Sequence, residues 1–147
     1  MSGQPPYYED LSVGMEIPMF SVTVRVEDVQ RFAGVNDRPA SAMHTDSTRA
    51  REIGLPSAIV PGPLKCAYLG NMLTNWLRDH VWIMDLAVDF KEVDQVNSSI
   101  VAKGVVRELA VRDGKHIAEC EVWIENAQGR RTSVGAATLA VLSRSEA

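Results

Sequence analysis

The sequence GPLKCAYLGNMLTNWLRD (residues 62–79) is followed by the alternating sequence VWIMDLAVDF (residues 81–90), and these two segments determine the architecture. In the first segment, apolar side chains recur at steps of three and four residues, as in an amphipathic helix. These side chains are Leu64, Ala67, Tyr68, Met72, Leu73, Trp76 and Leu77. Pro63 suits the first helical turn, because its missing N–H would have no partner there. The spacing therefore predicts one long, mostly buried helix over residues 63–79.

The rest of the chain after this helix has the period of two that is typical of strands. We expect strands at 81–90, 99–110, 116–126 and 131–142. Arg112-Asp113-Gly114 and Gln128-Gly129 are hairpin signals between the last three strands. In the first strand, we expect a buried face that consists of Met84, Leu86, Val88 and Phe90.

The chain before the helix contains shorter segments. We expect an extended N-terminal arm over 1–19, a strand over 20–26, a short helix ending at Gly34, an irregular stretch over 35–47, and a short helix capped by Asp46 or Ser47 that ends at Gly54. Hairpins imply antiparallel pairing, and the apolar face of such a sheet needs the long helix as its cover. The prediction is a single α+β domain over 1–147, with an antiparallel sheet of about five strands wrapped around one central helix.

The composition excludes several classes of protein. Lys and Arg number 15 against 19 Asp and Glu, a net charge of −4, so the basic footprint of a nucleic-acid binder is missing. Two cysteines without CxxC spacing make no disulfide framework. No apolar run reaches the roughly 18 residues of a membrane span, and the N-terminal residues do not resemble a signal peptide. We expect a cytoplasmic protein that binds neither nucleic acid nor membrane.

Two features carry candidate chemistry. Asp37 and His44 lie in the irregular stretch, where a loop that folds back would bring a carboxylate and an imidazole together as an acid/base pair. The alternative is ordinary turn chemistry, with His44 capping or packing. Gly62 begins the long helix, whose free N–H groups and dipole would suit an oxyanion. The alternative there is an ordinary helix start.

The remaining candidates favour structural roles. His80 and His116 share no metal-ligand spacing with His44, so we expect no metal site. Ser57 and Cys66 lack the local sequence context of a nucleophile.

Four segments together resemble the MaoC-like, (R)-specific enoyl-CoA hydratase family of the hot-dog fold, over nearly the whole chain. They are YYEDLSVGMEIP, VEDVQRFAGVND, HTDSTRAREIGLPSAIVPG, and the long helix with the strand that ends in DLAVDF. The family's series of Asp, His, Asp, Ala, Gly and helix-opening Gly matches Asp37, His44, Asp46, Ala50, Gly54 and Gly62. The segment from Asp37 to His44 is two residues longer than in the family and lacks its Asn, and Pro61 stands where the family often has His.

The resemblance implies an activity and a site. Asp37 and His44 would together activate water that adds to a trans-2-enoyl thioester, or act in the reverse dehydration, while the Gly62 N–H polarises the thioester carbonyl. Asn36, Pro61 and Pro63 are the substrate-binding residues expected beside them. The substrate would be an acyl-CoA or an acyl-carrier thioester, with no cofactor. The resemblance also implies a homodimer or higher oligomer, or a heteromer with a second hot-dog subunit.

Two alternatives stay open. The chain is a non-catalytic acyl-CoA-binding subunit of a heteromeric hydratase, or it is a hot-dog thioesterase. Residues 63–78 of the long helix contain no Asp or Glu, which argues against the thioesterase.

Overall fold

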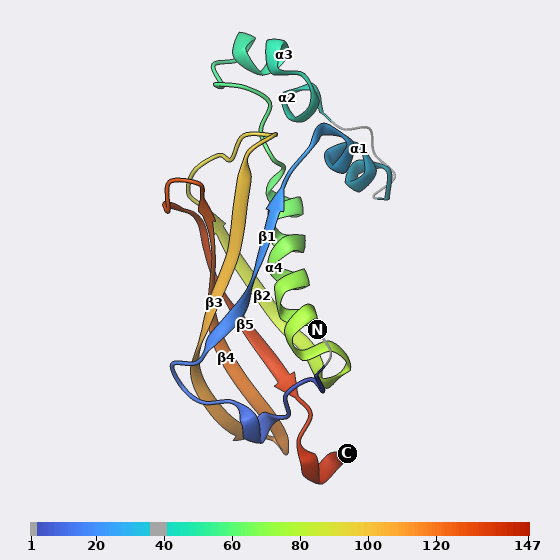
Figure 1. Ribbon diagram of the computed structural model, residues 1–147, viewed down its shortest axis with the longest axis vertical. Helices are drawn as coiled ribbons and strands as arrows, with labels where there is room; N and C mark the ends of the chain where they lie inside the picture. The colour runs from blue at the N-terminus through green and yellow to red at the C-terminus, as the bar shows by residue number, and fades with distance from the viewer. Residues whose placement is uncertain (1–2, 36–40) are drawn as a thin grey trace.

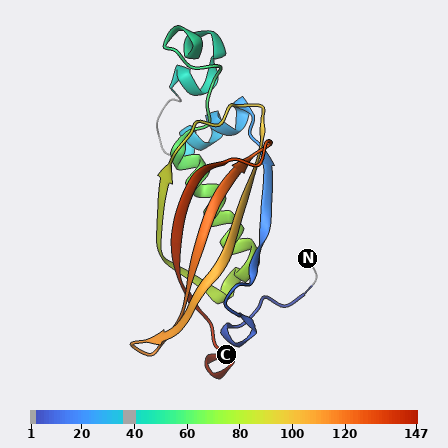
Figure 2. The ribbon, with the colours of Figure 1, turned by 90° about the vertical axis from the view of Figure 1, so that its left-hand side faces the viewer.

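The computed structural model describes residues 3–35 and 41–147, and five strands among them form one antiparallel sheet. The strands are β1 (Glu16–Thr23), β2 (Val81–Phe90), β3 (Ser99–Arg112), β4 (Lys115–Asn126) and β5 (Arg131–Val141). Their order across the sheet is β1-β3-β4-β5-β2, so β1 and β2 are the two edges. The sheet curves around a single long helix (Figures 1 and 2). The chain therefore has the α+β architecture that its sequence predicts.

The long helix, α4 (Gly62–Leu77), lies on the concave face of the sheet and supplies the centre of the core. Its side chains Leu69, Met72 and Leu73 are fully buried. Alternate residues of β4 face them, including Val122 and Ile124, which are buried as well. Full burial of one such side chain contributes roughly 1.5–3 kcal/mol, so the packing of α4 against the sheet dominates the stability of the fold.

The other helices are α1 (Val26–Val35), α2 (Ala42–Thr45) and α3 (Ser47–Glu52), with single turns of 3₁₀ helix at η1 (Tyr8–Asp10), η2 (Arg78–His80) and η3 (Arg144–Glu146). Helices α2 and α3 project beyond the end of the sheet (Figure 1). The N-cap of α3 is Asp46, whose carboxylate accepts hydrogen bonds from the N–H groups of Thr48 and Arg49. The predicted cap is therefore confirmed.

Three local expectations differ from the structure. Strand β1 begins at Glu16, within the stretch expected as an extended arm, and ends at Thr23 rather than at residue 26. Helix α2 lies inside the stretch 35–47 that was expected to be irregular. In β2, the register shifts between Ile83 and Asp85, and this bulge moves Ile83 rather than Met84 to the core side. Met84 is consequently exposed, as is Phe90 at the end of the strand.

The connection from β2 to β3, residues 91–98, crosses from one edge of the sheet towards the other, because β2 pairs with β5 and β3 pairs with β1. It also holds the segment that precedes α4. Ile59 and Gln95 form an antiparallel bridge, the Val60 N–H donates to the Asp94 carbonyl (2.7 Å), and the Val96 N–H donates to the Ala58 carbonyl (2.8 Å). This loop therefore holds the segment that leads into α4.

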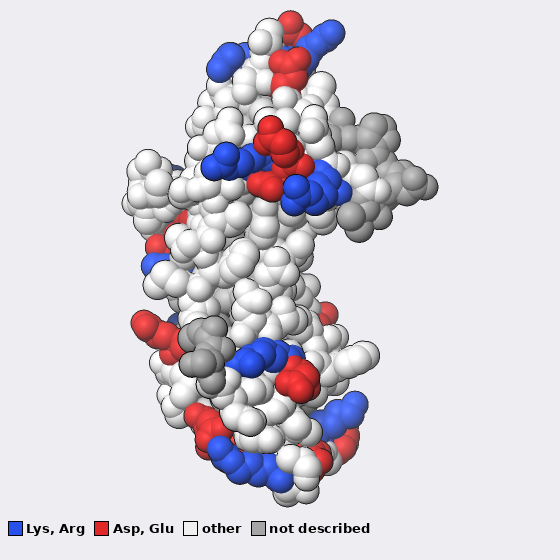
Figure 3. Space-filling view, turned by 45° about the vertical axis from the view of Figure 1, so that its right-hand side comes forward, with Lys and Arg blue, Asp and Glu red and all other residues white. Residues whose placement is uncertain are grey.

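The surface shows mixed charge. On the face drawn in Figure 3, basic and acidic side chains lie next to one another, and broad uncharged areas separate these groups. Within residues 3–35 and 41–147, no helix is long and apolar enough to cross a membrane.

Candidate active site

His44 lies on α2, and a hydrogen bond of its ring fixes its orientation. Its Nδ1 is 2.7 Å from the carbonyl oxygen of Ile59. A carbonyl oxygen only accepts, so Nδ1 carries the proton of this hydrogen bond. In the neutral imidazole, Nε2 then keeps its lone pair and can accept a proton. The Ile59 N–H also donates to the Met43 carbonyl (3.0 Å), so two hydrogen bonds join α2 to the segment before α4.

His44 and Gly62 line the same pocket, which has a volume of about 270 Å³. The lining residues are His44, Ile59, Val60, Gly62, Lys65, Phe90, Lys91, Glu92 and Val93. They come from α2, from the segment just before α4, from the start of α4, from the end of β2 and from the loop after β2. The topology thus brings together two residues that are 18 positions apart in the sequence.

Gly62 is the first residue of α4, and the Phe90 ring packs against it where a side chain would stand. The Pro61 carbonyl accepts from the N–H groups of Leu64 (3.1 Å) and Lys65 (3.2 Å), while the N–H of Gly62 precedes the residues that can bond within the helix. A Cβ at position 62 would lie 2.8 Å from the Phe90 ring. The absence of a side chain here leaves the positive end of the helix dipole facing the pocket.

A buried ion pair lies behind the pocket wall. Lys65 Nζ is 3.1 Å from Asp94 Oδ2, and the two side chains are only 3% and 2% exposed. Lys65 Nζ also donates to the Glu92 carbonyl (3.2 Å), and the Thr132 hydroxyl donates to Asp94 Oδ2 (2.6 Å). Sequence reasoning missed this cluster. The available signal was that Lys65 stands three and four positions before Tyr68 and Leu69, on the buried face of the helix.

Of the other site residues expected from the sequence, some lie beside Gly62 and others fall outside the described residues. Pro61 is the N-cap of α4 and Pro63 is its second residue, so both flank Gly62. Asn36 and Asp37 lie outside the described residues. The structure therefore brings His44 and Gly62 together and leaves the Asp37–His44 pair as an expectation of the sequence.

The two candidate nucleophiles have structural surroundings. Burial raises the pKa of the Cys66 thiol, which keeps it in the unreactive protonated form. The Ser57 hydroxyl donates to the Gln95 side chain (2.8 Å), on the loop that braces the segment before α4. Neither side chain has an adjacent general base among its recorded partners.

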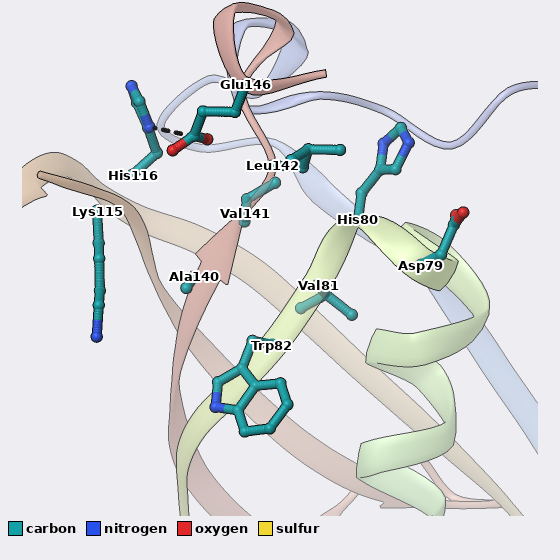
Figure 4. Close-up of a pocket in the computed structure, with 10 residues that line it drawn as sticks. All are labelled: Asp79, His80, Val81, Trp82, Lys115, His116, Ala140, Val141, Leu142 and Glu146. Carbon is teal, nitrogen blue, oxygen red and sulfur yellow. Dashed lines mark ion pairs between the residues drawn. The ribbon is translucent and has the colours of Figure 1, made fainter.

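A second pocket, of about 380 Å³, lies at the far end of α4 (Figure 4). His116 and Glu146 stand on one side of it, with His116 Nδ1 3.5 Å from Glu146 Oε2, and Trp82 stands on another. His80 lines the same pocket, and its Nδ1 is 3.0 Å from the Pro6 carbonyl. In the described part of the chain, no three His, Cys, Asp or Glu side chains are grouped as metal ligands.

Comparison with known proteins gives matches at the level of structure. Neither a family profile nor a curated protein sequence matches this chain. The R-hydratase PhaJ1 from Pseudomonas aeruginosa superposes with a TM-score of 0.85 at 17% identity, covering 94% of this chain and 86% of that one. The MaoC-like dehydratase from Rhodospirillum rubrum gives a TM-score of 0.80 at 17% identity, covering 95% and 98%.

A third similar structure is the ChsH1–ChsH2 complex from Mycobacterium tuberculosis, with a TM-score of 0.76 at 17% identity, covering 88% of this chain and 98% of that one. The chain therefore has the hot-dog fold of (R)-hydratases and MaoC-like dehydratases. At these identities the likeness establishes the fold, whereas activity has to be argued from the site.

Proposed function

We propose that this protein is a hydratase or dehydratase of acyl thioesters, which adds water to a trans-2-enoyl-CoA to give a 3-hydroxyacyl-CoA, or catalyses the reverse reaction. The observation that carries the proposal is that His44, with its Nδ1 proton engaged by Ile59, shares one pocket with the first residue of α4. Addition of water to a conjugated thioester uses a base to activate the water and a donor, such as a helix N-terminus, to stabilise the thioester oxygen.

The chemical step is a conjugate addition. The oxygen of water bonds to C3 of the enoyl thioester, a proton of that water passes to His44 Nε2, and C2 receives a proton from the Asp37–His44 pair. The carbon–carbon double bond is consumed and the thioester stays intact. No electrons are transferred to an acceptor, so the reaction needs no redox cofactor, and the thioester is the substrate.

Gly62 stabilises the charge that develops during the addition. As the nucleophile approaches C3, electron density moves to the thioester oxygen. An N–H at the start of a 16-residue helix is preorganised to donate to that oxygen. Removal of one such donor in other enzymes lowers kcat by about 10²–10³-fold, so this contact is a substantial part of the proposed mechanism.

The test is substitution of the proposed pair. We expect His44→Ala and Asp37→Asn each to lower hydration of trans-2-enoyl-CoA by about 10²–10⁴-fold, the usual contribution of a positioned acid or base. Circular dichroism and size-exclusion profiles should match those of the unsubstituted protein. Asp113→Asn, in the exposed β3–β4 hairpin far from the pocket, is the control. Full activity in both pair variants would refute the proposal.

A partner-subunit role has one observation in its favour. Strand β2 is an edge of the sheet and carries exposed Trp82 and Met84, and one of the similar structures is a ChsH1–ChsH2 complex. In this version, the chain binds the acyl thioester and a second hot-dog subunit supplies the chemistry. Tight acyl-CoA binding without turnover, together with activity after addition of such a subunit, would favour it.

The thioesterase alternative is disfavoured by the described part of the pocket. Glu92 is the only carboxylate among its lining residues, and it forms an ion pair with Arg130. Detection of free CoA thiol during turnover would reverse this conclusion.

A further inference from the structure

We infer that Asp94, held by Lys65 and Thr132, is a positioning residue that fixes His44 relative to Gly62. The inference rests on the proposed function in taking His44 as the working side chain. It concerns three residues that do not enter the chemistry proposed above.

His44 depends on the segment 58–60 for its orientation. Its ring is oriented by the Ile59 carbonyl, at 2.7 Å, and α2 is bound to the same residue through the Ile59 N–H and the Met43 carbonyl. A shift of Ile59 would therefore move the ring or weaken its hydrogen bond, because the bond weakens as its distance and angle leave their preferred range.

Segment 58–60 depends in turn on the loop after β2. The Val60 N–H donates to the backbone carbonyl of Asp94 at 2.7 Å, and Ile59 bridges Gln95. Asp94 is thus joined through its main chain to the residue that follows the acceptor of His44.

The side chain of Asp94 fixes this loop to the core. Its Oδ2 accepts from Lys65 Nζ (3.1 Å) and from the Thr132 hydroxyl (2.6 Å), and all three side chains are buried. Thr132 belongs to β5, while Lys65 lies in the first turn of α4, three residues after Gly62. One carboxyl group therefore connects the sheet, the start of α4 and the loop that holds His44.

The charge of the cluster suits this role better than simple packing. A buried ion pair adds little to stability compared with apolar side chains of similar size, because both ions lose their hydration. The ion pair instead fixes the relative positions of the groups that it joins. Lys65 is further bound to the Glu92 carbonyl (3.2 Å) and lies 5.4 Å from the centre of the Phe90 ring, so its ammonium has partners on several sides. Precise placement of pocket residues is what such fixed geometry contributes.

The test reads the tautomer of His44 directly, without any turnover. Long-range ¹H–¹⁵N correlation spectra of the neutral imidazoles distinguish a proton on Nδ1 from one on Nε2. The protein has three histidines, and the spectrum of His44→Gln identifies the signals of His44. We expect the unsubstituted protein to show mainly the Nδ1–H form.

The variants then separate positioning from general support. Thr132→Val keeps the side-chain shape but removes the donor to Asp94, and Thr132→Ser restores the donor. We expect Thr132→Val and Asp94→Asn to raise the minor Nε2–H tautomer roughly threefold or more, on the scale of part of one hydrogen bond. Thr132→Ser should match the unsubstituted protein. Asp113→Asn, the same chemical change in the exposed β3–β4 hairpin, should leave the His44 signals unchanged.

Each outcome bears on the inference. If Asp94→Asn fails to fold, Thr132→Val decides. Unchanged His44 signals in a folded Thr132→Val variant would overturn the inference. In the enzyme assay, we expect the same variants to lower kcat more than they raise KM. If the protein proves inactive while the tautomer shifts, the proposed function fails and the positioning role stands; if it is active and the tautomer does not shift, only the positioning role fails.

Discussion

In the proposed mechanism, His44 and Gly62 each act through one polar group that the fold leaves available. The ring of His44 is fixed through Nδ1, so the reactivity of the imidazole is concentrated at Nε2. Gly62 offers a backbone N–H at the start of α4, with the Phe90 ring packed where a side chain would stand. These two groups are the ones that the proposed addition of water to a polarised double bond uses.

Gly62→Ala tests whether the substrate needs close approach to the start of α4. The added Cβ would lie 2.8 Å from the Phe90 ring, which is 49% exposed and can swing away. We therefore expect a change of less than about 1 kcal/mol in the free energy of unfolding, since Ala also favours the helix, and a loss of activity of about tenfold or more as the pocket is reshaped. Urea denaturation and initial rates measure the two effects.

Gly70→Ala is the matched control for this substitution. Position 70 lies in the middle of the same helix, with nothing within 4 Å of the added Cβ. It should stabilise the protein by roughly 0.5–1 kcal/mol and leave the rate unchanged. Equal rates for Gly62→Ala and Gly70→Ala would show that close approach to Gly62 is not used.

The helices and strands were mostly predictable, because their signals are periodic and local. The stripe of apolar residues in 63–79 and the turns at Asp113-Gly114 and Gln128-Gly129 correspond to α4 and the two hairpins. The bulge after Ile83 was not predictable, since a register shift depends on the pairing with β5 and leaves no mark in the alternation of β2. It reverses the expected exposure of Met84.

The candidate site was predictable only in part. His44 and Gly62 could be named from sequence, but the helix that carries His44 has four residues, too few for a periodic signal. Asp94 lies in a loop, and its importance comes from contacts with Lys65 and Thr132, which lie 29 and 38 positions away. Contacts of this kind depend on tertiary packing and not on local sequence.

The pairing of β2 with β5 depends on a glycine. A Cβ at Gly135 would collide with the backbone carbonyl of Ala87 and lie 3.1 Å from the Val88 Cα. Because backbone atoms cannot swing aside, we expect Gly135→Ala to lower the free energy of unfolding by about 2 kcal/mol or more. Hydrogen exchange should show the loss of protection concentrated in β2. Stability equal to that of Gly70→Ala would contradict the assigned register.

The two ends of the described chain close one end of the molecule. The Tyr8 N–H donates to the Leu142 carbonyl (2.9 Å), Glu9 binds the Ser143 hydroxyl, and Asp10 forms an ion pair with Arg144 at 2.8 Å. The Ser143 hydrogen bond is the main cause that lowers the pKa of Glu9, and the Tyr7 backbone N–H followed by the Arg144 side chain lowers the pKa of Asp10. This contact between the termini therefore favours the ionised carboxylates.

The stability of this contact should depend on pH. A carboxyl group whose pKa is lower in the folded state stabilises the fold above its unfolded pKa and loses that contribution as the pH falls through the folded value. We expect the Tm of the protein to drop between about pH 5 and pH 3, and the Glu9→Gln/Asp10→Asn double variant to show a shallower drop. Thermal melts across this range, with Glu27→Gln as the control, measure it. Parallel curves for the protein and its double variant would contradict the assignment.

The edge strand β2 leaves an apolar edge of the sheet exposed. Trp82 is 74% exposed and Met84 is 45% exposed on a strand with no neighbour on its outer side among the described strands. An exposed edge strand presents unpaired N–H and C=O groups with which another chain can pair. We predict a dimer or larger assembly at micromolar concentration in sedimentation equilibrium, and a shift towards monomer in the Trp82→Lys/Met84→Lys variant. A purely monomeric unsubstituted protein would contradict this expectation.

The central claim is that this fold and this pocket hydrate an enoyl thioester. It is tested most directly by following the ultraviolet absorbance of the conjugated enoyl thioester with the purified protein and a short series of trans-2-enoyl-CoA esters. We expect a loss of absorbance without release of free thiol, and no loss with His44→Ala. No change in absorbance across the series, or a loss of absorbance matched by thiol release, would contradict it.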